Sequence, residues 1–489
     1  MTNLYQVLKA TAERQPANIA VSDCENCSTV TYAQLLGRVD GLAKRFRAAG
    51  IVPGDCVGLH VASGLNYIIR TYALWKLGAC VVPIPLELAP REKRQVCQRI
   101  AIDTIVSSDR SVGFLSGIDA HEIARVGSCR IIRMTPLRQH PTDFTSVNAA
   151  FIRFSSGTTG AAKGVVLSHE TIFDRVHAAN AGLELTPDDR VVWLLSMSYH
   201  FAVSIVAYLT FGATIILHKR AIDLGRALVE DAAGQRGTVI YGSPSHYELM
   251  ARDRSGRELP DLRLAISTAT ALSADTARAF HERFDVPLTQ AYGIIEIGLP
   301  CINLCHAGEK LDSVGQPQPS FGVRLVNRDD AGGMSSIGFR GKGFLDAYYD
   351  PWQPRSEIMQ DGWFYTGDLG EMDEEGSLYI RGRASEMINV GGMKFFPREV
   401  EEVLNTHPAI EEAVVFAARK GNAREFACAQ VVPRAEARVI PTPVELRQFC
   451  AKRLAHFKVP QEVEFVASLE RTASGKIIRS AVVREIQAS

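Results

Sequence analysis

Short apolar segments with strand character alternate with amphipathic segments of helical period along most of the chain. Strand-like runs lie at residues 57–61, 80–84, 214–217, 238–241, 264–267 and 288–292, and helical patterns lie at residues 65–77 and 91–99. Strands that alternate with helices form mostly parallel sheets that are covered by helices on both faces. The sequence therefore predicts an α/β fold.

The pattern changes after Ser313. Glycine, aspartate and short β-branched runs dominate up to Gly382, which predicts a β-rich subdomain. A helix at residues 399–405 and strands at 414–418, 427–432 and 463–466 then predict a compact α+β unit. We expect a large N-terminal core over residues 1–382, a hinge at 383–385 and a small mobile C-terminal domain over 386–489, in a chain of 489 residues.

Composition excludes some partners. Lys plus Arg and Asp plus Glu both number 54, so the net charge is zero and nothing indicates a nucleic-acid partner. The ten cysteines, including the isolated pair Cys24 and Cys27, show no disulfide or zinc spacing. Residues 1–15 lack the apolar run of a signal peptide, so we expect a cytoplasmic protein.

An uncharged stretch at residues 191–217 is long enough to cross a membrane. Its Ser, Thr, Tyr and His residues and the break at Gly212 favour a strand, a helix and a strand inside the core. We therefore expect no membrane span.

Residues 154–164 have the sequence FSSGTTGAAKG and lie between two apolar strands. Small residues leave backbone N–H groups uncovered, and Lys163 adds a positive charge, so the loop suits an anion such as a triphosphate. It is not a Walker A motif, because Gly and Lys are not adjacent within it. A flexible linker is the alternative, but the flanking strands favour a strand–loop–strand hairpin.

This loop resembles the phosphate loop of the adenylate-forming ligases, which include acyl- and aryl-CoA synthetases, peptide-synthetase adenylation domains and luciferases. Further segments resemble family motifs and follow in the family's order: QAYGIIE at 290–296, WFYTGDLG at 363–370, RGRASEMIN at 381–389, VGGMKFFPREVE at 390–401 and RTASGKI at 471–477. The resemblance implies an enzyme that joins a carboxylic acid to AMP from ATP and then transfers the acyl group to a thiol. It also implies Mg²⁺, with CoA or phosphopantetheine as the acceptor.

The resemblance implies site residues one by one. Those expected to bind ATP are Ser155, Ser156, Gly157, Thr158, Thr159, Gly160, Lys163, Gln290, Ala291, Tyr292, Asp368, Arg383 and Lys476. Asp368 would accept hydrogen bonds from the ribose hydroxyls. Glu296, with Thr158, is expected to hold Mg²⁺, a cation that prefers oxygen ligands. Lys476 is the expected catalytic residue, because an acid carboxylate must attack an anionic phosphate and a cation there stabilises the developing charge.

His200 and Tyr199 stand where the family has a His or an aromatic residue beside the substrate carboxylate. We expect His200 to orient the acid, with a core histidine as the alternative. The expected acid pocket consists of Tyr199, His200, Phe201, Val203, Thr268, Thr270, Gly293, Ile294 and Leu299. No carboxylate near residues 199–204 is placed to pair an ammonium group, so we expect α-amino acids to be poor substrates. β-Branched residues at 267–271 suggest a small or narrow acid.

Several positions depart from the family. Ser385 is the expected hinge, where the family has Asp or Lys. Gly391 and Gly392 are expected to line the thiol tunnel, and Gly391 stands where some CoA ligases have Lys. Ala162 replaces a Pro, and Ile295 replaces a Thr that contacts the α-phosphate. We expect free CoA to be the acceptor, and a pantetheinylated acyl or peptidyl carrier protein is the alternative. A non-catalytic protein that binds nucleotide or docks a carrier is a more remote alternative.

Overall fold

The computed structural model describes residues 2–108, 112–155, 163–327, 334–419, 425–437, 439–471, 477 and 484–485. The expected phosphate-loop residues Ser156, Gly157, Thr158, Thr159 and Gly160 lie outside these ranges, as does Lys476. For Ser155 the backbone alone is described.

Two large sheets form the N-terminal body. The first contains, in spatial order, β20 (Trp352–Pro354), β19 (Ala347–Tyr349), β9 (Lys163–Ser168), β8 (Ala149–Ser155), β4 (Cys80–Pro83), β3 (Cys56–His60), β5 (Thr104–Ser107), β7 (Cys129–Met134) and β6 (Ala120–Val126). The second contains β16 (Gln316–Pro317), β15 (Gly298–Ile302), β14 (Leu288–Ile294), β13 (Leu264–Ser267), β12 (Val239–Gly242), β10 (Arg190–Trp193), β11 (Thr214–Leu217), β1 (Ile19–Asp23) and β2 (Ser28–Thr31). Their central strands are parallel, as strands joined through helices must be.

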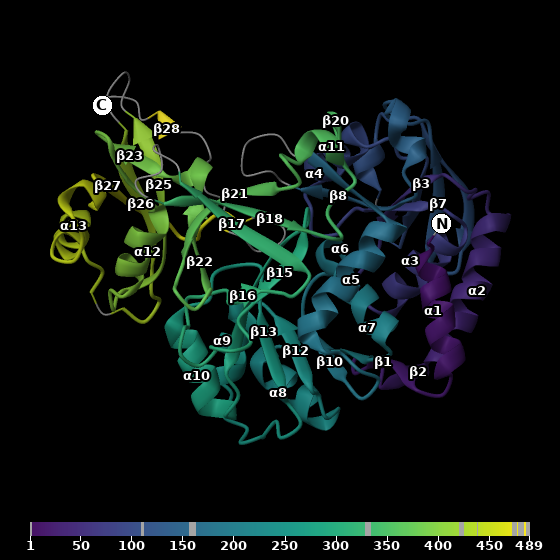
Figure 1. Ribbon diagram of the computed structural model, residues 1–489, viewed down its shortest axis with the longest axis horizontal. Helices are drawn as coiled ribbons and strands as arrows, with labels where there is room; N and C mark the ends of the chain where they lie inside the picture. Colours follow the sequence, from purple (N-terminus) through teal and green to yellow (C-terminus); the bar gives the residue numbers. More distant parts are fainter. Residues whose placement is uncertain are drawn as a thin grey trace.

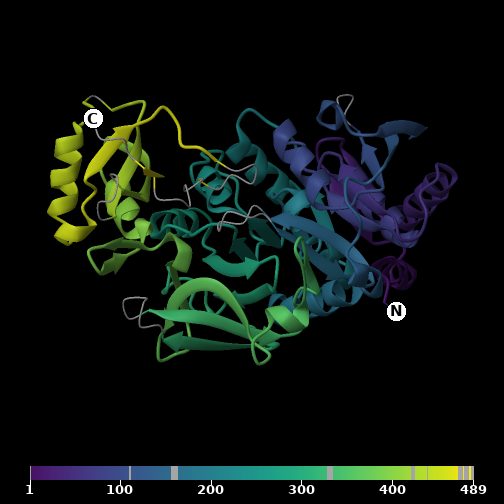
Figure 2. The same cartoon turned by 90° about the horizontal axis from the view of Figure 1, so that it is seen from above.

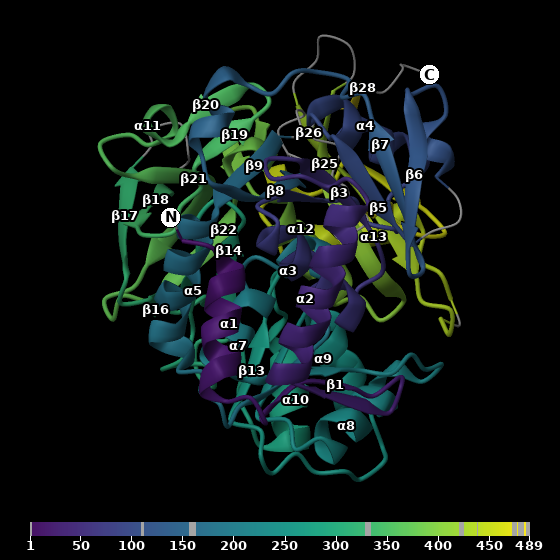
Figure 3. The same cartoon turned by 90° about the vertical axis from the view of Figure 1, so that its right-hand side faces the viewer.

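Helices cover both sheets. They are α1 (Leu4–Arg14), α2 (Tyr32–Ala48), α3 (Leu65–Lys76), α4 (Pro90–Arg99), α5 (His169–Leu183), α6 (Met197–His200), α7 (Ile205–Phe211), α8 (Leu224–Gly234), α9 (Pro244–Ala251), α10 (Ala274–Phe284) and the short α11 (Arg355–Ile358). In Figure 3, α3, α5 and α7 lie in the body near α1 and α2, while α8, α9 and α10 lie together at its lower end.

Three hydrophobic cores follow from this layering. One core joins the inner faces of both sheets through α3, α5 and α7, and includes Val81 and Ile215. A second packs the other face of the first sheet against α4, and a third packs the other face of the second sheet against α8, α9 and α10. Sheets buried on both faces explain why their strands are continuous apolar runs.

The β-rich subdomain is an antiparallel sheet of β17 (Phe321–Asn327), β18 (Ser335–Gly341), β21 (Phe364–Met372) and β22 (Leu378–Arg383). Figure 2 shows this sheet alongside the body.

The C-terminal unit follows this sheet. It contains the hairpin β23 (Ile388–Val390) and β24 (Met393–Phe395), the helices α12 (Pro397–Asn405) and α13 (Pro443–Ala451), and a sheet of β27 (Glu462–Phe465), β26 (Phe426–Pro433), β25 (Ile410–Arg419) and β28 (Arg484–Glu485). The unit has a core of its own and lies at one end of the molecule, to the left in Figure 1.

The structure confirms the predicted fold class. Residues 191–217 form β10, α6, α7 and β11 inside the body, as the polar residues of that stretch predicted. A search of the described residues finds no helix with the length and apolar character that crossing a membrane requires.

Candidate active site

The expected phosphate loop connects two paired strands. β8 and β9 are antiparallel, and their last register pair joins Ser155 to Lys163. The two strands of the predicted strand–loop–strand hairpin are therefore present, one on each side of residues 156–162. The ammonium nitrogen of Lys163 lies 4.3 Å from the ring centroid of Tyr348, on the face of that ring.

Asp368, Arg383 and Tyr292 meet in one cluster. Asp368 on β21 and Arg383 on β22 are register partners, and Arg383 Nε lies 2.8 Å from Asp368 Oδ1. The hydroxyl of Tyr292 on β14 donates a hydrogen bond to Asp368 Oδ2. Burial and then the charge of Asp368 raise the pKa of Tyr292 well above its ordinary value, so the phenol remains a donor. Two consecutive strands, β21 and β22, and the distant strand β14 thus meet at one carboxylate, which is 4% exposed.

Glu296 lies two residues after β14 and contacts a neighbour of the phosphate-loop hairpin. Tyr348 on β19 donates a hydrogen bond to Glu296 Oε1 at 3.3 Å, and β19 pairs with β9. Burial and then the charge of Glu296 raise the pKa of Tyr348. Tyr348 therefore links Glu296 to Lys163. The sequence analysis missed this residue, because its position depends on the pairing of β19 with β9.

The turn that carries Glu296 is held by a buried arginine. Arg175 on α5 donates from Nη1 to the carbonyl oxygen of Ile295 at 2.8 Å, from Nη2 to that of Glu296 at 3.2 Å, and from Nε to that of Gly343 at 2.9 Å. Burial lowers the pKa of Arg175 to about 10, so it stays charged at neutral pH. These hydrogen bonds fix the backbone at Glu296 and so help to position its side chain.

A second arginine lies between the loop and the expected acid pocket. Arg153 on β8 donates from Nη1 to the carbonyl oxygen of Tyr199 at 2.9 Å, and its guanidinium lies 5.3 Å from the Tyr199 ring centroid. Burial lowers the pKa of Arg153, and the nearby charge of Glu296 opposes that effect. Arg153 was also missed by the sequence analysis, where it was one residue of an apolar strand.

Aromatic residues line the carboxyl ends of adjacent parallel strands. Trp193 at the end of β10 and Tyr241 on β12 are register partners, and their rings stack at 5.7 Å with planes 8° apart. His200 packs edge-on against Trp193 at 6.1 Å. Trp193 Nε1 and the hydroxyl of Ser267, at the end of β13, are buried and have no hydrogen-bond partner within the described ranges. A buried donor without a partner costs about 1–3 kcal/mol, so these groups suit a ligand or a water.

Other expected pocket residues are arranged differently. Phe201 is fully buried, and its ring packs against Tyr67, Tyr72 and Trp75 of α3, which favours a core role over the expected pocket role. Val203 and Ile294 are half-buried, Leu299 is buried and Thr268 is buried, whereas Thr270 is exposed. Gly293 leaves no room for a side chain, because a Cβ there would lie 2.6 Å from the carbonyl oxygen of Gly298.

Gln290 is engaged within the protein. Its Oε1 accepts from the backbone N–H of Leu272 at 2.8 Å, and its Nε2 donates to the carbonyl oxygen of Ser313 at 3.3 Å. This favours a bracing role for the side chain over the expected ATP contact. Ala291 is buried and pairs with Ile302 of β15.

The expected hinge lies beside a close contact between the two parts of the chain. Ser385 is exposed within a short helix, Ala384–Glu386. Three residues before it, a Cβ on Gly382 would lie 2.5 Å from the ring of Phe396, which packs with Leu369. Gly391 and Gly392 form the exposed turn between β23 and β24, with φ of 61° and 93°, values that glycine adopts readily.

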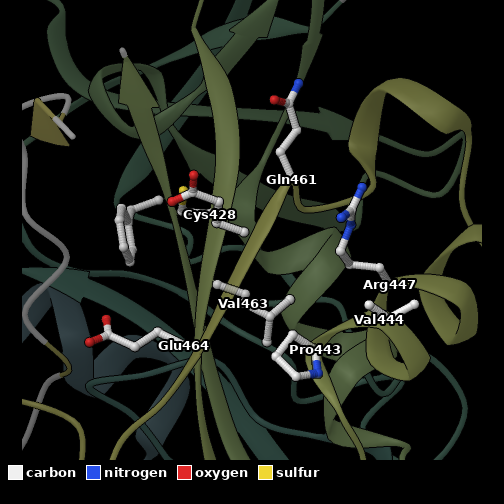
Figure 4. Close-up of a pocket in the computed structure, with 10 residues that line it drawn as sticks. Cys428, Pro443, Val444, Arg447, Gln461, Val463 and Glu464 are labelled. Atoms are coloured by element: carbon white, nitrogen blue, oxygen red, sulfur yellow. The ribbon is translucent and has the colours of Figure 1, made fainter. Parts of the chain in front are cut away.

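Figure 4 shows a cavity of about 560 Å³ in the C-terminal unit. Its lining includes Cys428, Pro443, Val444, Arg447 and Gln461, from β26, α13 and the segment before β27. None of the expected site residues lines it, so we do not assign it to the acid or to ATP.

The conformation of Ala269 leads to a stability prediction. This residue follows β13 with φ of 74°, a left-handed conformation that costs an L-residue with a Cβ about 1–2 kcal/mol. We expect Ala269→Gly to raise the free energy of unfolding by about 1 kcal/mol, measured by urea titration. Ala277→Gly, inside α10, should instead lower it by about 1 kcal/mol. A loss of stability in the Ala269 variant would contradict the strain at this position.

The fold and the clustered residues define a class, the ATP-dependent ligases that form AMP. Comparison with known proteins agrees. The chain matches the family described as AMP-binding enzyme over residues 8–348 and the AMP-binding enzyme C-terminal domain over residues 399–476. The chain therefore belongs to the AMP-binding enzyme family, and it is an AMP-forming acid–thiol ligase.

Individual relatives span nearly the whole chain. It is 28% identical to a feruloyl-CoA synthase of an Amycolatopsis species over 94% of both chains. It is 30% identical to an indoleacetate–CoA ligase of Aromatoleum aromaticum over 94% of this chain and 93% of the relative. The fold is similar to that of o-succinylbenzoate CoA synthetase (MenE) from Bacillus subtilis in complex with AMP, with a TM-score of 0.83, 23% identity and coverage of 98% and 97%.

Proposed function

We propose that this ligase activates an aromatic carboxylic acid that carries a hydrogen-bond acceptor, and transfers it to CoA. The observation that carries the proposal is the stacked pair Trp193 and Tyr241 at the ends of adjacent parallel strands, beside the unpartnered Trp193 Nε1 and Ser267 hydroxyl. Open α/β sheets bind ligands at the carboxyl ends of their strands. Flat rings stack well on aromatic walls, and a hydroxyl or methoxy oxygen on the acid would satisfy the indole N–H.

The names of two relatives support an aromatic acid. Feruloyl and indoleacetyl groups both contain an aromatic ring, and the feruloyl ring also carries oxygen substituents. These acids belong to the relatives and serve here as guides for choosing candidate substrates.

Two clusters would serve the nucleotide. Asp368, held by Arg383 and Tyr292, would accept from the ribose hydroxyls, and Lys163 would bind the departing pyrophosphate together with the phosphate loop. Arg153 would help to neutralise the negative charge that the acid and the phosphates bring together. His200, which packs on Trp193, would orient the acid, and Lys476 would reach the α-phosphate from the C-terminal unit.

Glu296 would hold the expected Mg²⁺. One of its oxygens accepts from Tyr348, which leaves the other oxygen for a hard cation, and Arg175 donates to its backbone carbonyl. The donor set fits the ion, because carboxylate and phosphate oxygens are its usual ligands. A bound Mg²⁺ would supply charge neutralisation on the phosphates.

Acid-dependent ATP–pyrophosphate exchange tests the proposal. The panel would contain benzoate, its three monohydroxy isomers, cinnamate, hydroxycinnamates, indoleacetate, hexanoate and an α-amino acid. We expect the strongest exchange with an oxygen-substituted aromatic acid and weak exchange with hexanoate and the amino acid. Trp193→Phe keeps an aromatic ring, smaller than the indole, and removes the N–H, so it should reduce the preference for the oxygen-substituted acid over its parent by about tenfold.

The outcomes separate the parts of the proposal. A preference for hexanoate would reject the aromatic pocket, and an unchanged preference in the Trp193 variant would reject the indole N–H as its source. Silence with every acid would favour the alternative of a non-catalytic protein.

The acceptor needs a separate assay. With the best acid and ATP, we expect thioester formation with free CoA to exceed that with a pantetheinylated carrier protein. Gly391 is the observation that favours the carrier, because this exposed turn residue lacks the cationic side chain found there in some CoA ligases. Transfer to the carrier alone would reject CoA as the acceptor.

A further inference from the structure

Three potential metal ligands gather at the starts of neighbouring strands of the first sheet, and Cys80 lies on the adjacent strand. Cys56 Sγ, a carboxylate oxygen of Asp103 and a ring nitrogen of His140 lie within 4.8 Å of one another. Cys80 is the register partner of Cys56 on the neighbouring parallel strand β4. Cys56 begins β3, Cys80 begins β4, and Asp103 directly precedes β5, so three adjacent strand starts supply three of the four groups.

The distance between His140 and Asp103 suits a small tetrahedral ion. Bonds of about 2.0–2.3 Å to a tetrahedral Zn²⁺ place neighbouring ligand atoms about 3.3–3.8 Å apart. His140 Nε2 lies 3.7 Å from Asp103 Oδ2. The backbone N–H of Cys56 donates to Asp103 Oδ2 at 2.7 Å, which holds the carboxylate beside the thiols.

His140 is oriented by groups behind it. Its Nδ1 lies 2.9 Å from the hydroxyl of Tyr349, which also accepts from the backbone N–H of Ala101 at 3.2 Å. The His140 ring stacks on Phe144 at 4.9 Å with planes 6° apart. With the proton on Nδ1, Nε2 presents its lone pair to the cluster, an arrangement typical of histidines that bind a metal.

The charges of the cluster favour a cation. Two arginines of this region have other partners: Arg133 pairs with Asp55 at 3.2 Å and Arg138 with Asp350 at 2.7 Å. Among the described residues, His140 is the side chain that forms an ion pair with Asp103.

We propose that Cys56, Cys80, Asp103 and His140 bind one Zn²⁺ ion in a structural site. Two thiolates, an imidazole and a carboxylate are ligands that Zn²⁺ accepts in tetrahedral sites, and binding would release two thiol protons to solvent. The site lies at the amino-terminal ends of β3 and β4, whereas the parallel strand β8 leads into the phosphate loop at its carboxyl end. The ion would therefore join the first residues of these strands to the segment that carries His140. It would lie at the end of the strands opposite the phosphate loop. Figure 3 shows β3, β5 and β7 side by side in this region.

Metal analysis of the full-length protein tests the site. The protein would be purified without chelators or metal-affinity resin, supplied with Zn²⁺ and dialysed, and zinc would be measured by mass spectrometry. We expect about one zinc per chain, and a lower thermal unfolding midpoint after chelation. Exchange with Co²⁺ should give the absorption of a tetrahedral thiolate site, and that absorption should lose about half of its charge-transfer intensity in Cys80→Ser.

Matched variants make the result decisive. Cys56→Ser and His140→Gln should each weaken zinc binding by at least about tenfold, and the half-exposed position of His140 makes that variant safe for folding. Cys97→Ser alters another buried cysteine of the same core and should retain zinc. Less than one-tenth of a zinc per wild-type chain would overturn the proposal, and so would zinc that persists in both Cys56→Ser and His140→Gln.

Discussion

Replacing Lys476 by alanine is expected to lower acid-dependent ATP–pyrophosphate exchange by about 100-fold or more. The attacking carboxylate and the α-phosphate are both anionic, and a cation at the bridging oxygens stabilises the charge that develops there. Removing one such preorganised group typically costs about 100- to 1,000-fold in rate. The measurement is the initial rate of label incorporation into ATP at saturating acid.

The second half-reaction supplies an internal control for this variant. Thioester formation from a synthetic acyl-adenylate does not need the α-phosphate to be attacked, so it should remain close to the wild-type rate. Lys452→Ala removes an exposed lysine after α13 in the same C-terminal unit and should leave both reactions unchanged. Undiminished exchange in Lys476→Ala would reject the catalytic role.

The layers of the fold could be predicted because they depend on local patterns. Each buried strand is an apolar run, and the hairpin around the phosphate loop is bounded by two such runs, β8 and β9. The helix-and-strand alternation at residues 191–217 could be distinguished from a membrane span by its polar residues. Local patterns of apolar and polar residues were therefore sufficient for the class of fold.

The supporting contacts of the site could not be predicted in this way. Tyr348 reaches Glu296 and Lys163 through the pairing of β19 with β9, two strands far apart in sequence. In the sequence, Arg175 is one charged residue of an amphipathic segment. In the structure, α5 buries it against the turn at Ile295. Gln290 stands inside a recognised motif, yet its amide is used by Leu272 and Ser313. Long-range packing decides these three cases, and no local pattern records it.

The cysteines show the same limit. Cys56 and Cys80 have no spacing that indicates a metal site, so the sequence favours ordinary reduced thiols. Their proximity arises because β3 and β4 are parallel neighbours that begin in register. His140 joins them from a loop, through contacts with Tyr349 and Phe144.

Asp368→Asn is expected to raise the KM for ATP by about 10- to 100-fold with a smaller change in kcat. Hydrogen bonds to a charged group contribute about 1.5–3 kcal/mol each, and the amide replaces one acceptor oxygen with a donor. The variant should still fold, because its Oδ1 can accept from Arg383 Nε while its Nδ2 donates to the Tyr292 hydroxyl. These are the two positions that the carboxylate oxygens occupy.

The split between KM and kcat separates ribose binding from a purely structural role. If Asp368 only braced β21 against β22, the amide would satisfy both neighbours and the KM for ATP would not change. If it binds the nucleotide, affinity falls although the midpoint of thermal unfolding is nearly preserved. Asp373→Asn is the matched control, since Asp373 follows the same strand and pairs with Lys310 at 2.7 Å, outside the cluster around Asp368. An unchanged KM in Asp368→Asn, or an equal rise in Asp373→Asn, would contradict a contact between Asp368 and the nucleotide.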